Sequence, residues 1–387
     1  MSNQYDCIVV GAGFAGITAA RELAERGNKK VLILERHPHI AGNCYDVENK
    51  DGILIHQYGP HIFHTSNKRV FQYLSRFTEW RHYHHCVVGD LHGLLIPIPF
   101  NLYSLRLVFD KEKADRLEKK LIETFGLNKK VPILELRKSE DPEIRDLAEF
   151  VYENVFLKYT MKQWGKKPNE IDPAVTGRVP VFISRDNGYF QDLYQGMPLN
   201  GYTPLAQNIA DHPNITIRYE TDCRKVLKID GSKVEFEGKP YNGIIIFTGQ
   251  VDELFGRCYG MLPYRTLDFA FETHDVTFYQ QNSVVNYTVD QDYTRITEFK
   301  YLTGQDVPNK TTIVKEYSRQ YEGKEGEIPY YTVANPESLQ MYQKYVDLAS
   351  KVPHLYLLGR LAEFKYYNID GIVEKALELA DRILENK

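Results

Sequence analysis

The chain has 387 residues, of which 43% are hydrophobic and 26% are charged, and its formal net charge is −4. This length predicts two or three domains, and the ordinary globular composition has no basic excess that would favour a nucleic-acid partner. The five cysteines are scattered without a CxxC pair, which indicates a reducing compartment rather than a disulfide framework or a zinc site. Because there is no charged leader with an apolar stretch and no run of about 18 apolar residues, we expect a cytoplasmic protein without a membrane span.

The first strand, turn and helix predict a dinucleotide site. Apolar residues Cys7–Val10 form the strand, and a GxGxxG turn follows with Gly11, Gly13 and Gly16. These glycines allow a tight turn, a close approach of the backbone to a pyrophosphate, and close packing of the helix on the sheet. Glu35 ends the next apolar strand, where its carboxylate can accept hydrogen bonds from both ribose hydroxyls. The motif leaves FAD and NAD open.

Helical and extended patterns alternate along the rest of the chain. Gly27 is expected to end the first helix as a left-handed cap. Helices are predicted over residues 111–125, 144–159 and 204–210. Strands are predicted over residues 215–219, 223–229, 233–236 and 243–249. Residues 262–332 alternate and are rich in β-branched and aromatic side chains, as in TFYQQNSVVNYT, TRITEFKYL and TTIVKEY, which predicts an antiparallel sheet.

The fold class predicted from these patterns is α/β, with a discontinuous Rossmann-like domain that binds the dinucleotide. Because three αβ pieces lie far apart in the sequence, this domain must be interrupted twice. We expect it to comprise residues 1–85, 195–260 and 333–387. A helical domain is expected at residues 101–194, and an antiparallel sheet domain at residues 86–100 and 261–332.

The last αβ piece favours FAD over NAD. A buried strand ends at Gly359 and Arg360, and a new helix begins near Asp370. A second helix N-terminus that faces the same cleft can stabilise negative charge on N1 and O2 of a reduced isoalloxazine. Simple NAD enzymes need no such closing segment. The alternative is that this piece is only the final βα unit of the sheet.

Several longer motifs resemble one family. They are YGPHIFHT (58–65), FNLYS (100–104), KYTMKQWG (158–165), GRVPV (177–181), NGYFQDLYQGMPLNGYT (187–203), YTRITE (293–298), PYY (329–331) and GRLAEFKYYNID (359–370). In this order they resemble the bacterial flavin-dependent UDP-galactopyranose mutases. The resemblance spans essentially the whole chain and implies an FAD domain, a helical domain that aids dimerisation, and a six-stranded sheet domain.

The resemblance also implies a reaction. The enzyme would interconvert UDP-galactopyranose and UDP-galactofuranose and so supply galactofuranose for cell-surface polysaccharide. N5 of reduced FAD would attack C1 of galactose and expel UDP, the ring would open through a flavin iminium, and O4 would close onto C1. Because there is no net redox change, the flavin acts other than as a net electron carrier, and the resemblance implies that it acts as a nucleophile. No second GxGxxG is present to hold a nicotinamide reductant, so the electron donor is unidentified, with NAD(P)H as one candidate.

Site residues follow from the same motifs. The resemblance assigns Arg178 and Arg295 to the diphosphate and His61 to the flavin near N5. It assigns to the substrate Phe156, Tyr159, Trp164, Tyr189, Tyr331, Tyr366 and Asn368, with Trp164 as a gate beside a lid at residues 165–175. It assigns to the cofactor Gly11, Gly13, Phe14, Ala15, Gly16, Glu35, Arg36, Gly42, Asn43, His61, Ile62, Gly359, Arg360, Asp370 and Ile372. No metal is expected, since no third ligand accompanies His61 and His64, and the nearby residues His82, His84 and His85 are interpreted as surface.

Other functions stay open at this point. Asn368 stands where the family commonly has an acidic residue, and Thr332 where it has proline, so a mutase for UDP-N-acetylgalactosamine or dTDP-fucose is an alternative. An FAD oxidoreductase of the amine-oxidase superfold is a second alternative. A binding protein like the GDP-dissociation inhibitors is a third, and the intact glycines and Glu35 argue against it.

Overall fold

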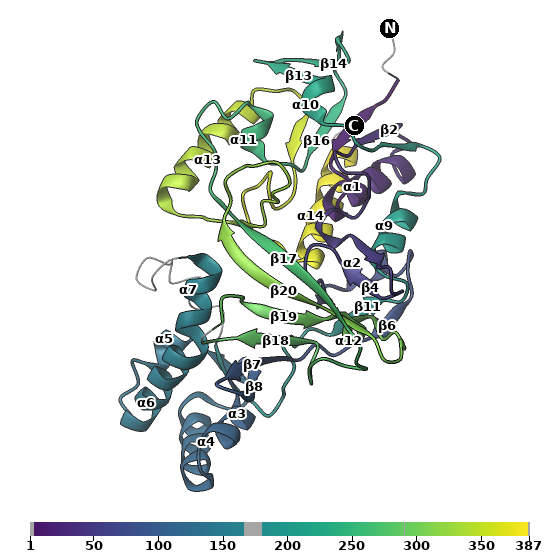
Figure 1. The fold of residues 1–387 in the computed structure, drawn as a ribbon. Helices are drawn as coiled ribbons and strands as arrows, with labels where there is room; N and C mark the ends of the chain where they lie inside the picture. The colour runs from purple at the N-terminus through teal and green to yellow at the C-terminus, as the bar shows by residue number, and fades with distance from the viewer. Residues whose placement is uncertain (1–3, 166–179, 290, 386–387) are drawn as a thin grey trace.

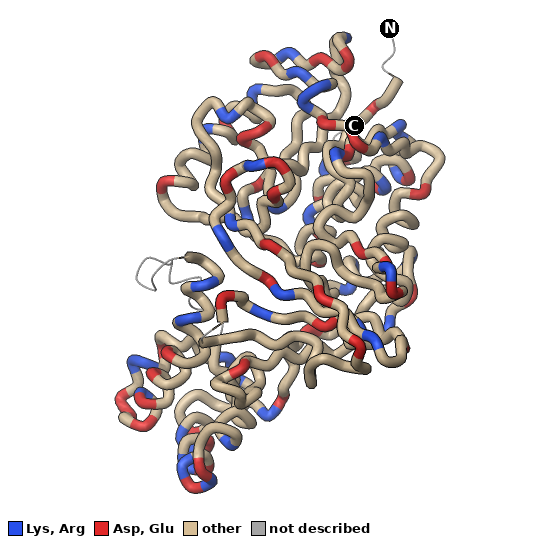
Figure 2. The backbone as a smooth tube through the Cα atoms, viewed as in Figure 1, with Lys and Arg blue, Asp and Glu red and all other residues tan. Residues whose placement is uncertain are grey.

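The computed structural model describes residues 4–165, 180–289 and 291–385. Figure 1 shows a twisted parallel sheet with its helices, a second long sheet in the middle of the molecule, and a group of helices at the lower left. Lysine and arginine positions are interspersed with aspartate and glutamate positions along the backbone in Figure 2. No helix among the described residues is both long enough and apolar enough to cross a bilayer.

The parallel sheet has the strand order β12-β2-β1-β16-β22. Its strands are four-residue or shorter runs of mostly apolar residues, namely β1 (Cys7–Val10), β2 (Val31–Leu34), β12 (Ile215–Arg218), β16 (Ile244–Phe247) and β22 (Leu355–Leu357). Helices α1 (Phe14–Glu25) and α14 (Ile369–Glu385) pack against each other beside this sheet (Figure 1). The sheet is therefore assembled from three distant segments, as expected for an interrupted Rossmann-like domain.

Two glycines explain how α1 packs. A Cβ at Gly16 would lie 2.0 Å from the carbonyl oxygen of Gly11, so only glycine lets the helix lie this close to the turn. The prediction that Gly27 is a left-handed cap is wrong, because the positive φ is at Asn28 (48°). Gly27 instead permits close packing, since its Cβ would lie 2.7 Å from Leu384 on α14.

Smaller elements surround the parallel sheet. The pair β3 (Asp46–Glu48) and β4 (Leu54–His56) leads to a three-stranded sheet of β5 (Phe63–Thr65), β11 (Tyr194–Pro198) and β6 (Trp80–His82). The strand predicted at residues 223–229 is partly wrong, because Asp222 caps a short helix α10 (Cys223–Val226) before β13 (Leu227–Asp230). The other elements here are α2 (Lys68–Leu74), α9 (Tyr202–Ala210), β14 (Lys233–Phe236), β15 (Lys239–Pro240), α11 (Val251–Leu254) and α13 (Pro336–Ala349), with the short 3₁₀ turn η1 (Gly42–Cys44).

The middle segment of the chain is mainly helical. It contains α3 (Leu102–Val108), α4 (Lys111–Phe125), α5 (Ile133–Leu136), α6 (Pro142–Val151), α7 (Lys158–Trp164) and the strand pair β9 (Lys129–Val131) and β10 (Val181–Ile183). The single helix predicted at residues 144–159 is interrupted by a π-helical turn, η2 (Tyr152–Leu157). Such turns are frequent at functional sites because they rotate the side chains that follow.

The second sheet has seven strands in the order β21-β17-β20-β19-β18-β7-β8. They are β7 (Val87–Leu91), β8 (Leu94–Ile98), β17 (Tyr264–His274), β18 (Val284–Tyr287), β19 (Arg295–Glu298), β20 (Thr311–Gln320) and β21 (Tyr331–Thr332). Six strands were expected, and one pair, β18 with β7, is parallel rather than antiparallel. Within TFYQQNSVVNYT only β18 is extended, and TRITEFKYL turns into helix α12 (Phe299–Thr303) after β19.

Separate hydrophobic clusters support this arrangement. One cluster joins α1, α14 and α9 with the parallel sheet, and another joins α4 and α6 with β7 and β8. The α/β fold class is confirmed, while the domain boundaries stay a prediction.

Candidate functional site

The first cavity lies where the strands β1, β2 and β16 of the parallel sheet end. Gly11 follows β1, Glu35 follows β2, and Thr248 follows β16. This edge is where α/β sheets hold their ligands. Predicted cofactor residues that line the cavity are Gly11, Gly13, Phe14, Ala15, Glu35, Arg36, Gly42, Asn43, His61, Gly359, Arg360 and Ile372. We call it the cofactor cavity.

The glycine turn leaves the N-terminus of α1 open to this cavity. Gly13 is the N-cap of α1 and offers no side chain to its first N–H groups, and no acidic residue lies in the first turn. Gly11 has a φ of +102°, and a Cβ there would lie 2.2 Å from Oγ1 of Thr248. The turn can therefore bring backbone N–H groups against a diphosphate.

Glu35 is held as a buried anion at one end of the cofactor cavity. Its Oε2 accepts a hydrogen bond from the Ala12 N–H (2.7 Å), and its Oε1 accepts from the backbone N–H of His37 and lies 2.8 Å from His37 Nδ1. Burial raises the pKa of the carboxyl, but these hydrogen bonds outweigh it and the net pKa is lowered. Since each carboxylate oxygen can accept more than one bond, ribose hydroxyls can still bind here.

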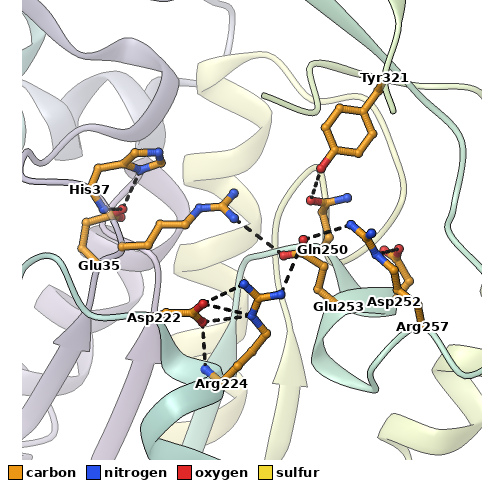
Figure 3. Close-up of polar contacts among 10 residues, drawn as sticks. Glu35, His37, Asp222, Arg224, Gln250, Asp252, Glu253, Arg257 and Tyr321 are labelled. Atoms are coloured by element: carbon orange, nitrogen blue, oxygen red, sulfur yellow. Dashed lines mark hydrogen bonds and ion pairs between the residues drawn. The ribbon is translucent and has the colours of Figure 1, made fainter. Parts of the chain in front are cut away.

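Charged side chains near Glu35 contact one another, as Figure 3 shows, and among them Arg36, Arg224 and Glu253 line the cofactor cavity. Glu253 Oε2 lies 3.6 Å from Arg36, and its Oε1 lies 3.9 Å from Arg224 and 3.1 Å from Arg257. Arg224 is also paired with Asp222 at 2.7 Å. One carboxylate thus links three guanidinium groups from separate parts of the chain in a charge network.

A second cavity, the substrate cavity, meets the first. Both are lined by His61, Arg360, Asn368 and Ile369. Its volume of about 510 Å³ is typical of a small-molecule site. Among the described residues, no aspartate or glutamate lines it. Predicted residues that line it are His61, Ile62, Phe156, Tyr159, Trp164, Tyr189, Arg295, Tyr331, Tyr366 and Asn368.

Arg295 carries a fixed positive charge on the sheet side of the substrate cavity. It is the cross-strand neighbour of Glu316, and its Nε donates to Glu316 Oε1 at 2.7 Å. Burial lowers the pKa of the guanidinium, but the Glu316 carboxylate outweighs it and holds the pKa well above its usual value. The ion pair uses only Nε, so both Nη groups are left without a hydrogen bond to any described residue.

Arg360 carries the second charge, at the boundary of the two cavities. Its Nη1 donates to the Tyr330 carbonyl (3.2 Å), and its Nη2 donates to the Tyr367 carbonyl (2.7 Å). Its guanidinium lies 4.6 Å from the centre of the Tyr366 ring. No carboxylate of a described residue lies within ion-pair distance of it, so its charge faces both cavities.

His61 lies between the cavities as a neutral imidazole with a defined tautomer. Its Nδ1 is 2.9 Å from the Gly59 carbonyl, which can only accept, so Nδ1 carries the proton and Nε2 has the lone pair. Burial, with the nearby His56 and Arg360, lowers the pKa of His61 to about 3. The His61 backbone N–H donates to Nδ1 of the buried His56 at 3.0 Å. Its ring can therefore accept a hydrogen bond but is uncharged.

Aromatic side chains form the remaining walls of the substrate cavity. Trp164 and Tyr331 have ring centres 6.3 Å apart, and Tyr331 stacks on Tyr366 at 6.1 Å. Burial raises the pKa of Tyr331 to about 12 and raises that of Tyr159 as well. These phenols thus stay neutral and can donate hydrogen bonds to an anion.

Comparisons with known proteins decide the family. Residues 154–366, more than half of the chain, match the family model described as UDP-galactopyranose mutase, and residues 9–77 match an NAD(P)-binding Rossmann-like domain. The UDP-galactopyranose mutase of Mycoplasma pneumoniae is 33% identical over 99% of this chain and 97% of its own length. The chain belongs to the UDP-galactopyranose mutase family. It is therefore an isomerase and a flavoprotein.

Other relatives define the range of this family. A dTDP-fucopyranose mutase of Escherichia coli is 35% identical over 98% of this chain and 98% of its own length. A crystal structure of a reduced UDP-galactopyranose mutase has the same fold, with a TM-score of 0.71 and 15% identity over 100% of this chain and 95% of that one. Membership of this family therefore establishes the type of enzyme, while the identity of its nucleotide-sugar substrate is left to be tested.

Not every predicted site residue of this mutase-family chain lines the expected cavity. Gly16 has a packing role, Ile62 lines the substrate cavity only, and Asp370 lies in the first turn of α14 and lines neither cavity. Arg178 and most of the lid at residues 165–175 lie outside the described residues.

Several lining residues were missed by sequence reasoning. The interpretation of His85 as surface is wrong, because it is 4% exposed, packs against Phe190 and lines the substrate cavity. Burial lowers its pKa to about 3. The signal was present, since His85 precedes Val87 by two residues and alternate residues of a strand share a face. His64, Gln163 and Asn286 also line this cavity. Among the described residues, no group of three or more His, Cys, Asp or Glu side chains could hold a metal ion.

Proposed function

We propose that the protein interconverts UDP-galactopyranose and UDP-galactofuranose with reduced FAD as its cofactor. One observation carries the proposal: the cofactor cavity shares four lining residues with a second cavity that contains two arginines and, among its described lining residues, no carboxylate. A neutral substrate would not need this excess of positive charge. A nucleoside diphosphate sugar would, because its diphosphate departs from C1 and returns in each turnover.

The cofactor cavity fits FAD by the chemistry of its residues. The glycine turn accommodates a diphosphate, and the Glu35 anion can accept from ribose hydroxyls. Arg360 supplies positive charge where the cavities meet, which favours an anionic reduced isoalloxazine. When bound in the reduced state, the flavin would supply N5 as a nucleophile for C1 of the sugar.

Arg295 and Arg360 would bind the diphosphate and stabilise the charge that develops as the C1–oxygen bond breaks. A guanidinium can place two N–H groups on one phosphate, and Arg295 has both Nη groups available. Because Glu316 fixes Arg295 and two carbonyls fix Arg360, little reorganisation is needed during the reaction. Arg178 stays a predicted third partner of the diphosphate.

The nucleoside would lie against Phe156, which is part of the π-helical turn, and Tyr159, which follows it in α7. Trp164 ends α7 beside them, and its position is fixed by the Gln163 carbonyl, which accepts from Arg265 Nε (3.1 Å) and from Ser318 Oγ (2.6 Å). The indole and the tyrosines Tyr331 and Tyr366 would cover the sugar and keep water from C1.

A mutase for dTDP-fucose is the second candidate. It is favoured by the similarity to the E. coli dTDP-fucopyranose mutase, which matches that to the UDP-galactopyranose mutases in extent, and by Asn368 in place of the acid common in the family. The deciding experiment incubates the dithionite-reduced protein with UDP-galactofuranose and with the furanose form of dTDP-fucose and separates the products. UDP-galactopyranose as the main product supports the proposal, whereas turnover of the dTDP sugar alone overturns it.

Three further properties stay predictions that accompany this function. A homodimer formed by the helical segment can be tested by light scattering in solution. A cytoplasmic location can be tested by fractionation of cells. NAD(P)H as electron donor can be tested by the loss of flavin absorbance at 450 nm, roughly the flavin maximum, when it is added without oxygen.

A further inference from the structure

A histidine–aspartate pair lies at the edge of the substrate cavity. His64, on β5, lines this cavity, and its Nδ1 is 2.8 Å from Oδ2 of Asp192. Ser66 Oγ donates to the other oxygen of Asp192 at 3.1 Å. The His64 ring stacks on Phe190, with ring centres 3.6 Å apart and an angle of 12° between the planes. Hydrogen bonding and stacking together hold the imidazole in one orientation.

The pair defines which nitrogen of His64 is available. A carboxylate can only accept, so Nδ1 of His64 carries a proton. The other nitrogen, Nε2, lies 3.4 Å from Nδ2 of Asn368, which lines both cavities. Nε2 is therefore directed toward the boundary where the cofactor and the substrate would meet. A carboxylate that holds Nδ1–H also stabilises the imidazolium that forms when Nε2 takes a proton.

Ring interconversion moves protons at two oxygens of the sugar, O4 and O5. In galactopyranose O4 carries a proton and O5 is the ring oxygen, and in galactofuranose the two are exchanged. Opening the pyranose breaks the C1–O5 bond, its electron pair stays on O5, and O5 must receive a proton. Closing the furanose forms the C1–O4 bond, and the O4 hydroxyl must lose a proton. A group that can give and take a proton at the same place serves both steps.

Other described titratable groups around this cavity are poorly suited to this task. Burial lowers the pKa of His61 and of His85 to about 3, so both are uncharged at neutral pH and cannot donate first. Arg295 stays protonated, because Glu316 holds its pKa high. Burial raises the pKa of Tyr331 to about 12. His64 differs from all of these in having a carboxylate partner on one nitrogen and the cavity boundary beside the other.

We propose that His64 is a catalytic residue that moves the proton between O5 and O4 of the sugar, with Asp192 as its positioning residue. The inference rests on the proposed function. In this cycle the protonated form of His64, whose Nδ1–H is held by Asp192, gives its Nε2 proton to O5 as the pyranose opens. It takes a proton back from O4 as the furanose closes. No net proton is consumed, no electron is transferred, and the reverse reaction uses the same two steps in the opposite order.

The test separates ring interconversion from cleavage of the C1–oxygen bond to UDP. UDP-galactopyranose labelled with ¹⁸O in the bridging position scrambles its label whenever that bond breaks and re-forms, whether or not the ring changes. The reduced holoenzyme is assayed for both processes, and binding of UDP-galactopyranose is measured by equilibrium dialysis. The variants are His64→Gln and Asp192→Asn. His84→Gln is the matched control, because His84 faces Asp186 at 3.6 Å, is 56% exposed and lines neither cavity.

We expect His64→Gln to slow interconversion about 100-fold or more, as for loss of a general acid–base, while isotope scrambling and binding change less than about threefold. Asp192→Asn gives the same split with a smaller loss, because Nδ1 of His64 has lost the carboxylate that holds it in position. Equal losses of scrambling and interconversion in both variants overturn the proposal. Unchanged interconversion in either variant overturns it too. Absence of both processes in the wild-type enzyme instead contradicts the proposed function.

Discussion

Asp252 lies beneath the charge network of the cofactor cavity and is expected to weaken the folded state at neutral pH. It is fully buried, its Oδ2 accepts from the Leu262 N–H at 3.3 Å, and Arg257 Nε lies 3.5 Å away (Figure 3). Its Oδ1 has no hydrogen-bond partner among the described residues. Burial raises the pKa of this carboxyl from 3.8 to about 6, despite the opposing effects of Leu262 and Arg257.

The size and sign of the effect follow from this pKa. A carboxyl whose pKa is raised on folding costs nothing below pH 3.8, costs progressively more between pH 3.8 and about 6, and costs the full amount above that. At about 1.4 kcal/mol for each pH unit between the two values, the full cost is about 3 kcal/mol at pH 7.5 and about 1 kcal/mol at pH 4.5. With an unfolding entropy of about 2.1 cal/mol/K per residue, 3 kcal/mol corresponds to about 4 °C in Tm for a chain of this length.

Asp252→Asn is therefore expected to raise Tm by up to about 4 °C at pH 7.5 and by about 1 °C at pH 4.5. The assay is differential scanning calorimetry of the holoprotein at fixed flavin concentration at both pH values. Asp222→Asn is the matched control, because the hydrogen bond from Arg224 lowers the pKa of Asp222, so this exchange should not stabilise at neutral pH. A gain of the same size at both pH values, or no gain, would refute the reasoning.

Three further predictions concern the two cavities. Glu35→Gln is expected to weaken flavin retention about tenfold, since hydrogen bonds to a charged group contribute about 1.5–3 kcal/mol. Retention is measured by ultrafiltration and flavin fluorescence. Unchanged retention would contradict the role of Glu35 as an acceptor for the cofactor. His56→Asn keeps a hydrogen-bond acceptor near the position of Nδ1 for the His61 N–H, whereas His56→Gln moves the acceptor by one bond. We therefore expect kcat to fall about tenfold in the glutamine variant only. Equal rates in the two variants would contradict this role of His56. Glu316→Gln leaves the charge of Arg295 without its ionic partner. Because Arg295 is 23% exposed, the loss in the free energy of unfolding should lie below the roughly 3–5 kcal/mol of a fully buried pair. Denaturant unfolding identical to that of the wild type would contradict a stabilising role of this ion pair.

The dinucleotide site could be predicted because its information is local. The turn from Gly11 to Gly16 and the strand before Glu35 occupy one short stretch of sequence, and each glycine has a steric reason that holds in any such turn. The arrangement of the substrate cavity is different. Its aromatic residues could be assigned only by resemblance, since no local pattern tells a cavity tyrosine from one of the core.

Contacts between distant residues explain what could not be predicted. His64 and Asp192 are 128 positions apart, and they meet because β5 pairs with β11, just before which Asp192 lies. The parallel pairing of β18 with β7 joins residues almost 200 positions apart. The alternation of apolar and polar residues along a strand predicts which face of the strand is buried. It does not predict which other strand lies beside it, so neither pairing could be predicted.

The order of the strands in the parallel sheet has a consequence for biosynthesis. β1 pairs with β2, which follows it closely, and with β16, which begins only after residue 243, and the cavity wall formed by Gly359 and Ile372 comes later still. During synthesis the first strand, turn and helix are therefore made before β16 and α14, which bury part of their apolar surface. The complete cofactor cavity exists only when all three segments have been joined, so flavin bound there reports that they have been.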